Sequence, residues 1–345
     1  MIRGVRQSLE AFVAVFLLLS ALPARGEEQP PLAAKDSLDS LTNDSEDACK
    51  CLATFAWKPG PFSVRLDPKG PKDQCDFLVR FPTPHPTGDA VNDLVAMEWY
   101  RPKDKDGVVQ KAPALVVVHE SGSSMPAGRA IARGIRDRGL HALLIHLPHY
   151  GLRRAGGKRP DETVLMNAIK QGIADVRRAR DAVAVLPDID TRHIGLQGTS
   201  LGGFVAALTG SLDHGFDSVF IMLAGGDLYD MVQNGRRETQ QFRDKMAQAG
   251  YQGEKLKEVL SLVEPTRIAH RLDPKTTWLF AAIHDEVVPI RNARKLAKAA
   301  KLDEDHHAEM LGGHISAALY LPVVMDQIVK EVRALEKPLA KAPTP

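Results

Sequence analysis

Two short runs of apolar residues, at 114–118 and 142–145, constrain the fold of this chain more than any other feature. Neither run contains a polar residue, and such uninterrupted runs are typical of strands that are buried on both faces of a parallel sheet. The segment between them, residues 127–138, is predicted to be the helix that crosses from one parallel strand to the next. The sequence therefore predicts an α/β fold on a mostly parallel sheet with helices on both faces.

The same alternation of strands and helices continues along the chain. Residues 161–186 carry apolar side chains at helical spacing and arginines on the opposite side, which predicts a helix packed on the sheet with a solvated arginine face. Strands are also predicted at 77–81, 94–100, 193–197, 219–223, 277–283 and 308–311. This alternation over such a length indicates one doubly wound domain, residues 48–336.

One hexapeptide, Gly-Thr-Ser-Leu-Gly-Gly at 198–203, fits the G-x-S-x-G pattern and lies where a strand is predicted to run into a helix. In that context Ser200 stands on a sharp turn that needs residues without bulky side chains at Gly198 and Gly202. The pattern by itself also occurs in ordinary glycine-rich turns, and this chain has 27 glycines. Residues after the later strands must therefore show whether Ser200 is a nucleophile.

Two residues follow later strands where a serine nucleophile needs an acid and a base. Asp285 comes after the strand predicted at 277–283, and His314 after the strand predicted at 308–311. In an open parallel sheet the site lies at the carboxyl ends of the strands, so both side chains are expected near Ser200. The chain order serine, acid, histidine is the order that this architecture imposes.

The acid has competitors in the sequence. Asp227 follows the strand at 219–223, so it is also expected at the carboxyl edge of the sheet, and Glu286 adjoins Asp285. We favour Asp285 because its Asp-x-x-Val-Pro spacing is the commoner arrangement, and Asp227 stays open as the alternative.

His314 has weaker competitors. His306 and His307 precede their strand and are expected at the opposite end of the sheet, and a packed or solvated imidazole is expected for His284. Three more histidines lie at strand ends near the expected site: His119, His146 and His149. Their spacing lacks the His-x-His or His-x-x-x-His pairs that would support a metal site, so we expect no metal.

On these residues the chain resembles the α/β-hydrolases over residues 50–335. The resemblance implies that Ser200 attacks a carbonyl carbon and that His314 takes the serine proton. It further implies that Asp285, in its ionised form, orients the imidazole and stabilises the imidazolium that forms. No cofactor is implied.

The resemblance also implies two backbone N–H donors for the oxyanion that develops. One is expected at Leu201, at the positive end of the helix after the nucleophile, and we assign the second to Ser121 in the turn after the strand at 114–118. The chain departs from the usual His-Gly in this turn, because it has His119-Glu120. Dienelactone hydrolases are similar in having His-Glu here, but their nucleophile is a cysteine.

A long insertion, residues 227–270, separates two of the predicted strands. Helices are predicted at 231–249 and 255–263, and in a hydrolase such an insertion often forms a cap over the serine that shapes the acyl pocket. The alternative is a pair of surface helices far from the site.

The first 26 residues have the parts of a secretory signal peptide. Two arginines precede an apolar run at 11–22 that is too short to span a bilayer comfortably, and small residues fit cleavage after Gly26. We therefore expect a secreted or periplasmic protein with no stable membrane anchor after cleavage; a retained anchor is the alternative. The acidic lead-in at 27–47 and the tail at 337–345 are expected to be disordered.

The three cysteines all lie near the start of the mature chain. Cys75 can pair with only one of the other two, and we expect one disulfide bond, from Cys49 or Cys51 to Cys75. Three reduced, buried thiols are the alternative, because an odd number of cysteines specifies no pairing.

Charge and motifs together narrow the function. A formal net charge of +2 gives no electrostatic case for nucleic acid as a partner. The sequence predicts an exported serine hydrolase that cleaves carboxylic esters, whether of small molecules, lipids or carbohydrates, through an acyl-serine intermediate. A peptidase of the prolyl-oligopeptidase kind shares the elbow motif, but this chain is too short for its usual propeller. A non-catalytic binding module is the third candidate, and the intact serine, acid and histidine argue against it.

Overall fold

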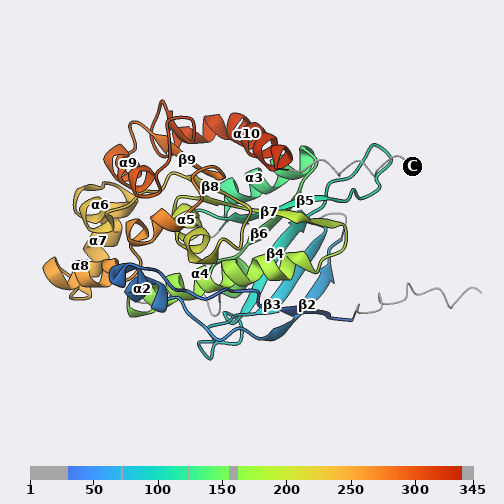
Figure 1. Cartoon of the computed structure of the whole chain (residues 1–345), viewed down its shortest axis with the longest axis horizontal. Coiled ribbons are helices and arrows are strands. Elements are labelled where there is room, and N and C mark those ends of the chain that lie inside the picture. Colours follow the sequence, from blue (N-terminus) through green and yellow to red (C-terminus); the bar gives the residue numbers. More distant parts are fainter. Residues whose placement is uncertain (1–29, 71–72, 123, 155–161, 336–345) are drawn as a thin grey trace, which may run out of the picture. The chain divides into compact units, whose positions relative to one another are not determined.

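The computed structural model describes residues 30–70, 73–122, 124–154 and 162–335. Its central element is one sheet (Figure 1). Within these residues the strand order is β1-β2-β3-β4-β6-β5-β7-β8-β9-β10. The strands are β1 (Leu32–Lys35), β2 (Pro61–Pro68), β3 (Phe77–Pro82), β4 (Leu94–Tyr100), β5 (Ala112–Val118), β6 (His141–Ile145), β7 (Ile189–Thr199), β8 (Ser218–Met222), β9 (Thr277–Ala282) and β10 (His307–Met310).

Two kinds of pairing divide the sheet. The pairs along β1-β2-β3-β4-β6 are antiparallel, and the pairs along β6-β5-β7-β8-β9-β10 are parallel. Parallel strands need a crossover, and helices follow these strands along the chain. The predicted strands are confirmed, and the carboxyl ends of β5, β7, β9 and β10 lie at one edge of the sheet.

Helices cover both faces of the sheet. The longer helices are α2 (Glu46–Ala53), α3 (Pro126–Asp137), α4 (Glu162–Ala184), α5 (Leu201–Asp213), α6 (Leu228–Asn234), α7 (Glu238–Gln248), α8 (Gly253–Ser261), α9 (Ile290–Ala299) and α10 (Leu321–Ala334). The helices α3 and α10 lie against each other on one face, and α4 and α5 pack together on the other (Figure 1). None of the helices within the described residues is both long and apolar enough to cross a membrane.

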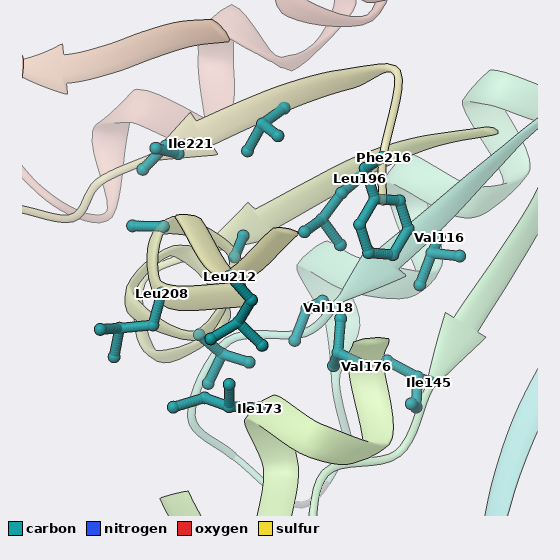
Figure 2. Packing of buried hydrophobic residues seen from close by; sticks show 14 of the residues in the cluster. Val116, Val118, Ile145, Ile173, Val176, Leu196, Leu208, Leu212, Phe216 and Ile221 are labelled. Atoms are coloured by element: carbon teal, nitrogen blue, oxygen red, sulfur yellow. The ribbon is translucent and has the colours of Figure 1, made fainter. Parts of the chain in front are cut away.

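Residues of β5 alternate between the two cores. Val116 and Val118 belong to the cluster under α4 and α5, whereas Leu115 and Val117 belong to the cluster under α3 and α10. Figure 2 shows the first cluster, in which Val176 of α4 and Leu212 of α5 approach the apolar side chains of the sheet. Successive residues of a strand face opposite sides, so an uninterrupted apolar run supplies both cores. The prediction of strands buried on both faces is confirmed.

The prediction that the lead-in at 27–47 is disordered is wrong for the part of it that the structure describes. Residues 32–35 form β1, which pairs with β2, and the residues that follow bind α4. Asp36 accepts hydrogen bonds from the guanidinium of Arg178 at 2.6 and 2.8 Å, and the Ser37 hydroxyl donates to Asp181 at 2.6 Å. Asp36 therefore neutralises a charge on α4. The prediction of a solvated arginine face on this helix is also wrong, because Arg177 and Arg178 are buried and paired with carboxylates. The predicted signal peptide and tail lie outside the described residues.

The predicted disulfide bond is wrong, because all three cysteines are unpaired. Cys51 packs in the cluster under α4 and α5, whereas Cys75 packs against the cluster under α3 and α10, so the sheet separates them. The Cys49 thiol lies 3.0 Å from the carbonyl oxygen of Asn43. Burial raises the pKa of both the Cys51 and the Cys75 thiol to about 11, which keeps them protonated at neutral pH.

The insertion between β8 and β9 differs from its prediction in one respect. A single helix was expected at 231–249, but the chain forms α6 and α7 with a break at 235–237. The break begins at Gly235, whose ψ of 153° is extended. A side chain at Gly235 would also meet Thr239, since an added Cβ would lie 2.6 Å from the Thr239 methyl group. Close packing of two short helices explains the glycine.

Candidate active site

Ser200 stands on a strained turn between β7 and α5. Its backbone has φ 53° and ψ −115°, a conformation that non-glycine residues adopt only when their surroundings enforce it. An added Cβ at Gly198 would lie 2.0 Å from the carbonyl oxygen of Gly202. One at Gly202 would lie 2.2 Å from the carbonyl oxygen of Val118 at the end of β5. The two glycines therefore let the turn close tightly enough to present the Ser200 hydroxyl above the sheet edge.

His314 connects Ser200 to Asp285 by two hydrogen bonds. Its Nε2 lies 2.9 Å from the Ser200 hydroxyl oxygen, and its Nδ1 lies 2.6 Å from an oxygen of the Asp285 carboxylate. A carboxylate accepts, so Nδ1 carries the proton and Nε2 is free to accept the hydroxyl proton. The structure thus brings together the three side chains that the sequence singled out, from the ends of β7, β9 and β10.

The Asp285 carboxylate is held on its other oxygen by the backbone. Oδ1 accepts the N–H groups of Val287 and Val288 at 2.8 and 2.9 Å, and Oδ2 faces His314. The side chain is only 1% exposed, against 12% for His314. A buried carboxylate with both oxygens occupied cannot rotate freely, so its direction toward the imidazole is fixed.

The loop that carries His314 is tied to the loop that carries Asp285. The N–H of His284 donates to the carbonyl oxygen of Gly312 at 2.9 Å, and the N–H of Gly313 donates to the Ser316 hydroxyl at 2.9 Å. An added Cβ at Gly313 would lie 3.2 Å from the His284 carbonyl oxygen. His284 therefore takes part through its backbone, in the join between the two loops.

Asp227, the alternative acid, is used elsewhere. Its Oδ1 accepts the N–H of Asp230 at 3.2 Å and caps α6, and its Oδ2 pairs with Lys295. Glu286, the other competitor, also has a different partner, because its carboxylate pairs with Arg237 at 2.9 Å. The structure thus places Asp285, and neither competitor, on the His314 imidazole.

The two expected oxyanion donors lie on neighbouring segments. Leu201 is the first residue of α5, so its N–H has no acceptor within the helix. Ser121 is exposed in the turn after β5, and the same turn contacts the elbow, since an added Cβ at Gly202 would lie 2.6 Å from the His119 carbonyl oxygen. The turn after β5 and the start of α5 therefore share one edge of the site.

Glu120, the departure from the usual pattern, caps a helix. Its two carboxylate oxygens accept the N–H groups of Ala127 and Gly128 at 2.8 and 3.0 Å, in the first turn of α3. Met125, the residue before that helix, offers no side-chain cap. A carboxylate at a helix start is favourable because it satisfies unpaired donors and the helix dipole. Pro126 marks this helix start in the sequence, but the role of Glu120, six residues earlier, has no local signature.

Two of the other histidines near the site, His119 and His146, are hydrogen-bonded within the protein. His119 Nε2 accepts the N–H of Leu147 at 3.1 Å, so its Nδ1 carries the proton that is donated to the carbonyl oxygen of Glu120 at 2.5 Å. Burial lowers the pKa of His119 to about 4, which keeps the ring neutral. His146 Nε2 lies 3.1 Å from Glu98, and its Nδ1 accepts the N–H of Leu152. Both rings support the loops around the site.

Comparison with known proteins gives structural likeness only. No family model matches the chain, and no curated protein sequence matches it. An acetyl xylan esterase from Paenibacillus sp. R4 is similar with a TM-score of 0.62 and 18% identity, over 87% of this chain and 97% of that chain. Acetyl xylan esterase 1 from Thermoanaerobacterium sp. has a TM-score of 0.52 and 14% identity, over 80% and 91%.

A third solved structure belongs to a different class of enzyme. It is a puromycin-hydrolyzing peptidase of Mycobacterium tuberculosis, with a TM-score of 0.55 and 13% identity, and it is matched over 80% of this chain and 46% of that chain. These likenesses agree with the sheet covered by helices on both faces that this chain forms. The chain has the α/β-hydrolase fold.

Proposed function

We propose that this protein is a serine hydrolase that cleaves carboxylic esters. The observation that carries the proposal is the unbroken hydrogen-bonded chain from the Ser200 hydroxyl through the His314 imidazole to the buried Asp285 carboxylate. Such a chain supplies a nucleophile, a base and a group that orients the base.

The geometry supports a two-step reaction. His314 takes the Ser200 proton as the oxygen attacks the ester carbonyl, and Asp285 stabilises the imidazolium that forms. The oxyanion is stabilised by the N–H groups of Leu201 and Ser121, which we propose as its donors. His314 then returns the proton to the leaving alcohol, and a water molecule releases the acid from Ser200 by the same steps in reverse order.

The ester class is favoured over the amide class by the similar structures. This chain covers nearly the whole of the esterase from Paenibacillus, whereas it covers under half of the puromycin-hydrolyzing peptidase. We propose a carbohydrate, lipid or small-molecule ester as substrate. A peptidase activity is the second candidate, and it would appear as faster turnover of aminoacyl anilides than of matched esters.

The experiment joins a covalent probe to a rate measurement. A fluorophosphonate probe is expected to label the protein and to fail on Ser200→Ala, and hydrolysis of p-nitrophenyl acetate is expected to fall about 10⁴-fold or more in that variant. Ser40→Ala, which removes an exposed serine hydroxyl, is the matched control. Absence of labelling, or labelling that survives Ser200→Ala, would sink the proposal.

We also propose that the protein is exported, on the basis of the charged start and the apolar run at 11–22. Expression of the full chain in a Gram-negative host, followed by fractionation and sequencing of the mature N-terminus, tests this. A mature protein in the periplasm that begins at Glu27 is expected. Recovery of the uncleaved chain in the membrane fraction would replace export with a retained anchor.

A further inference from the structure

The helical insertion contacts the loop that carries Asp285 through residues at the start of α7. The N–H of Arg236 donates to the carbonyl oxygen of Glu286 at 2.7 Å, and the Arg237 guanidinium pairs with the Glu286 carboxylate at 2.9 Å. The Thr239 hydroxyl donates to the carbonyl oxygen of Val287 at 2.8 Å. Residues at the start of α7 therefore hold the loop that carries Asp285, which we call the acid loop.

These contacts differ in burial. The side chains of Arg237 and Glu286 are 62% and 44% exposed, and an ion pair at that exposure contributes little. Thr239, in contrast, is 7% exposed. Leaving a buried carbonyl oxygen without its donor costs free energy, so among these contacts the Thr239 hydrogen bond is expected to matter most for the position of the loop.

The Thr239 bond reaches Asp285 through one peptide group. The carbonyl of Val287 and the N–H of Val288 belong to the same peptide unit, and that N–H donates to Asp285 Oδ1 at 2.9 Å. A donor on the carbonyl oxygen both fixes the plane of the peptide and polarises its N–H, which strengthens the bond that the N–H makes. The hydrogen-bonded series thus runs from Thr239 through the peptide and Asp285 to His314.

We propose that Thr239 is a positioning residue for the reaction: it aligns the Asp285 carboxylate on His314 through the 287–288 peptide. The helical insertion then serves as a support of the acid loop, whatever cover it gives to the substrate. The proposal rests on the proposed function, because it needs Asp285 to act on the base of the reaction.

The test compares three variants at this loop. Thr239→Val keeps the shape of the side chain and removes the hydroxyl, Thr239→Ser keeps the hydroxyl, and Arg237→Ala removes the exposed pair to the same loop. Rates are measured with p-nitrophenyl acetate and divided by the number of sites that a fluorophosphonate probe titrates, so that only folded, active molecules count. The pH profile of kcat/KM is recorded for each variant.

Thr239→Val is expected to lower kcat about three- to tenfold with KM unchanged, the loss that corresponds to one buried hydrogen bond. The acidic limb of its pH profile is expected to move to lower pH, because a less firmly held carboxylate stabilises the protonated imidazole less. Thr239→Ser is expected to restore both properties, and Arg237→Ala to leave both unchanged. A residue of purely structural importance would lower thermal stability without moving the limb.

An unchanged kcat and pH limb in Thr239→Val would overturn the inference, and so would an equal effect of Arg237→Ala. Should Thr239→Val not fold, Thr239→Ala carries the same expectations and the same contrary outcomes. The unaltered protein separates this inference from the proposed function: loss of probe labelling at Ser200 contradicts the function, whereas labelling with an indifferent Thr239→Val contradicts only the role of Thr239.

Discussion

Asp227 and Asp285 follow neighbouring parallel strands, β8 and β9, yet they serve different purposes. Both lie at the carboxyl edge of the sheet and both accept backbone N–H groups. The Asp227 side chain is 42% exposed and pairs with Lys295, whereas that of Asp285 is 1% exposed and binds His314. A place after a strand brings a residue to the edge, but the path of the next few residues decides which way the carboxylate faces.

That path differs at the first step. Asp227 has φ 56° and begins α6 at once, so its carboxylate turns toward the helix that follows. Asp285 begins a non-helical loop before α9, and the N–H groups of Val287 and Val288 gather on one of its oxygens. The second oxygen of Asp285 is then left to the histidine, which is the position that the proposed chemistry needs.

The largest difference between the two aspartates is expected in catalysis. Asp285→Asn is expected to lower kcat about 10⁴-fold with p-nitrophenyl acetate, because the amide favours the wrong imidazole tautomer. Asp227→Asn is expected to change kcat less than about twofold, since Asn caps helices as well as Asp does. Steady-state rates of the two variants provide the measurement, and comparable losses in both would show that the two aspartates do not differ in catalysis.

A smaller difference is expected in the free energy of unfolding. Asp227→Ala removes the cap of α6 together with the Lys295 pair and is expected to cost about 1 kcal/mol. Asp227→Asn keeps the cap and is expected to cost about half as much or less. Urea denaturation of both variants measures this; an equal cost in the two would assign the whole effect to charge.

The surroundings of Asp227 also predict a pH dependence. Burial acts to raise the pKa of the neighbouring Asp230, but hydrogen bonds from Arg291 and Asn292 outweigh it and leave this pKa below its usual value. A pKa lowered by folding stabilises the native state above the unfolded-state value and loses that contribution as the pH falls. Asp230→Asn is therefore expected to be less stable than the unaltered protein at pH 6, with a difference that shrinks below about pH 4. A difference that grows on acidification contradicts this.

The smallest effect is expected from salt. Lys295 and Asp227 are both nearly half exposed, so the destabilisation caused by Lys295→Met is expected to be a few tenths of a kcal/mol and to disappear near 1 M salt. Thermal unfolding at low and high ionic strength measures it. Persistence at high salt would indicate that the Lys295 stem contributes through packing.

The fold and the three proposed reacting residues could be predicted from the sequence because each depends on a local pattern. Apolar runs gave the parallel strands, and the ends of those strands placed Ser200, Asp285 and His314 at one edge. Asp227 could not be excluded from the sequence, since the cap of α6 and the pair with Lys295 exist only after the insertion has folded. The role of Thr239 could not be predicted from the sequence either, because its hydrogen-bond partner, Val287, lies 48 residues away along the chain.

The lead-in was misjudged because its stabilising contacts are also distant in sequence. The four residues of β1 carry no clear alternation, and Asp36 meets Arg178 across 142 residues. Composition describes what a segment would do alone in water, whereas this segment is fixed by charges on a helix far along the chain. The cysteines were misjudged likewise, because no spacing reveals that two thiols face opposite sides of a sheet.

The strand β1 has a consequence for the solubility of the protein. It is the edge strand of the sheet, only four residues long, and it pairs with Pro61–Val64 of β2. A short edge strand that carries a lysine resists edge-to-edge association with other molecules. A chain shortened to begin at residue 38 would expose the backbone of Pro61–Val64 in β2 and remove the carboxylate partner of Arg178. Aggregation, rather than loss of the reaction itself, is the failure that such a truncation would produce.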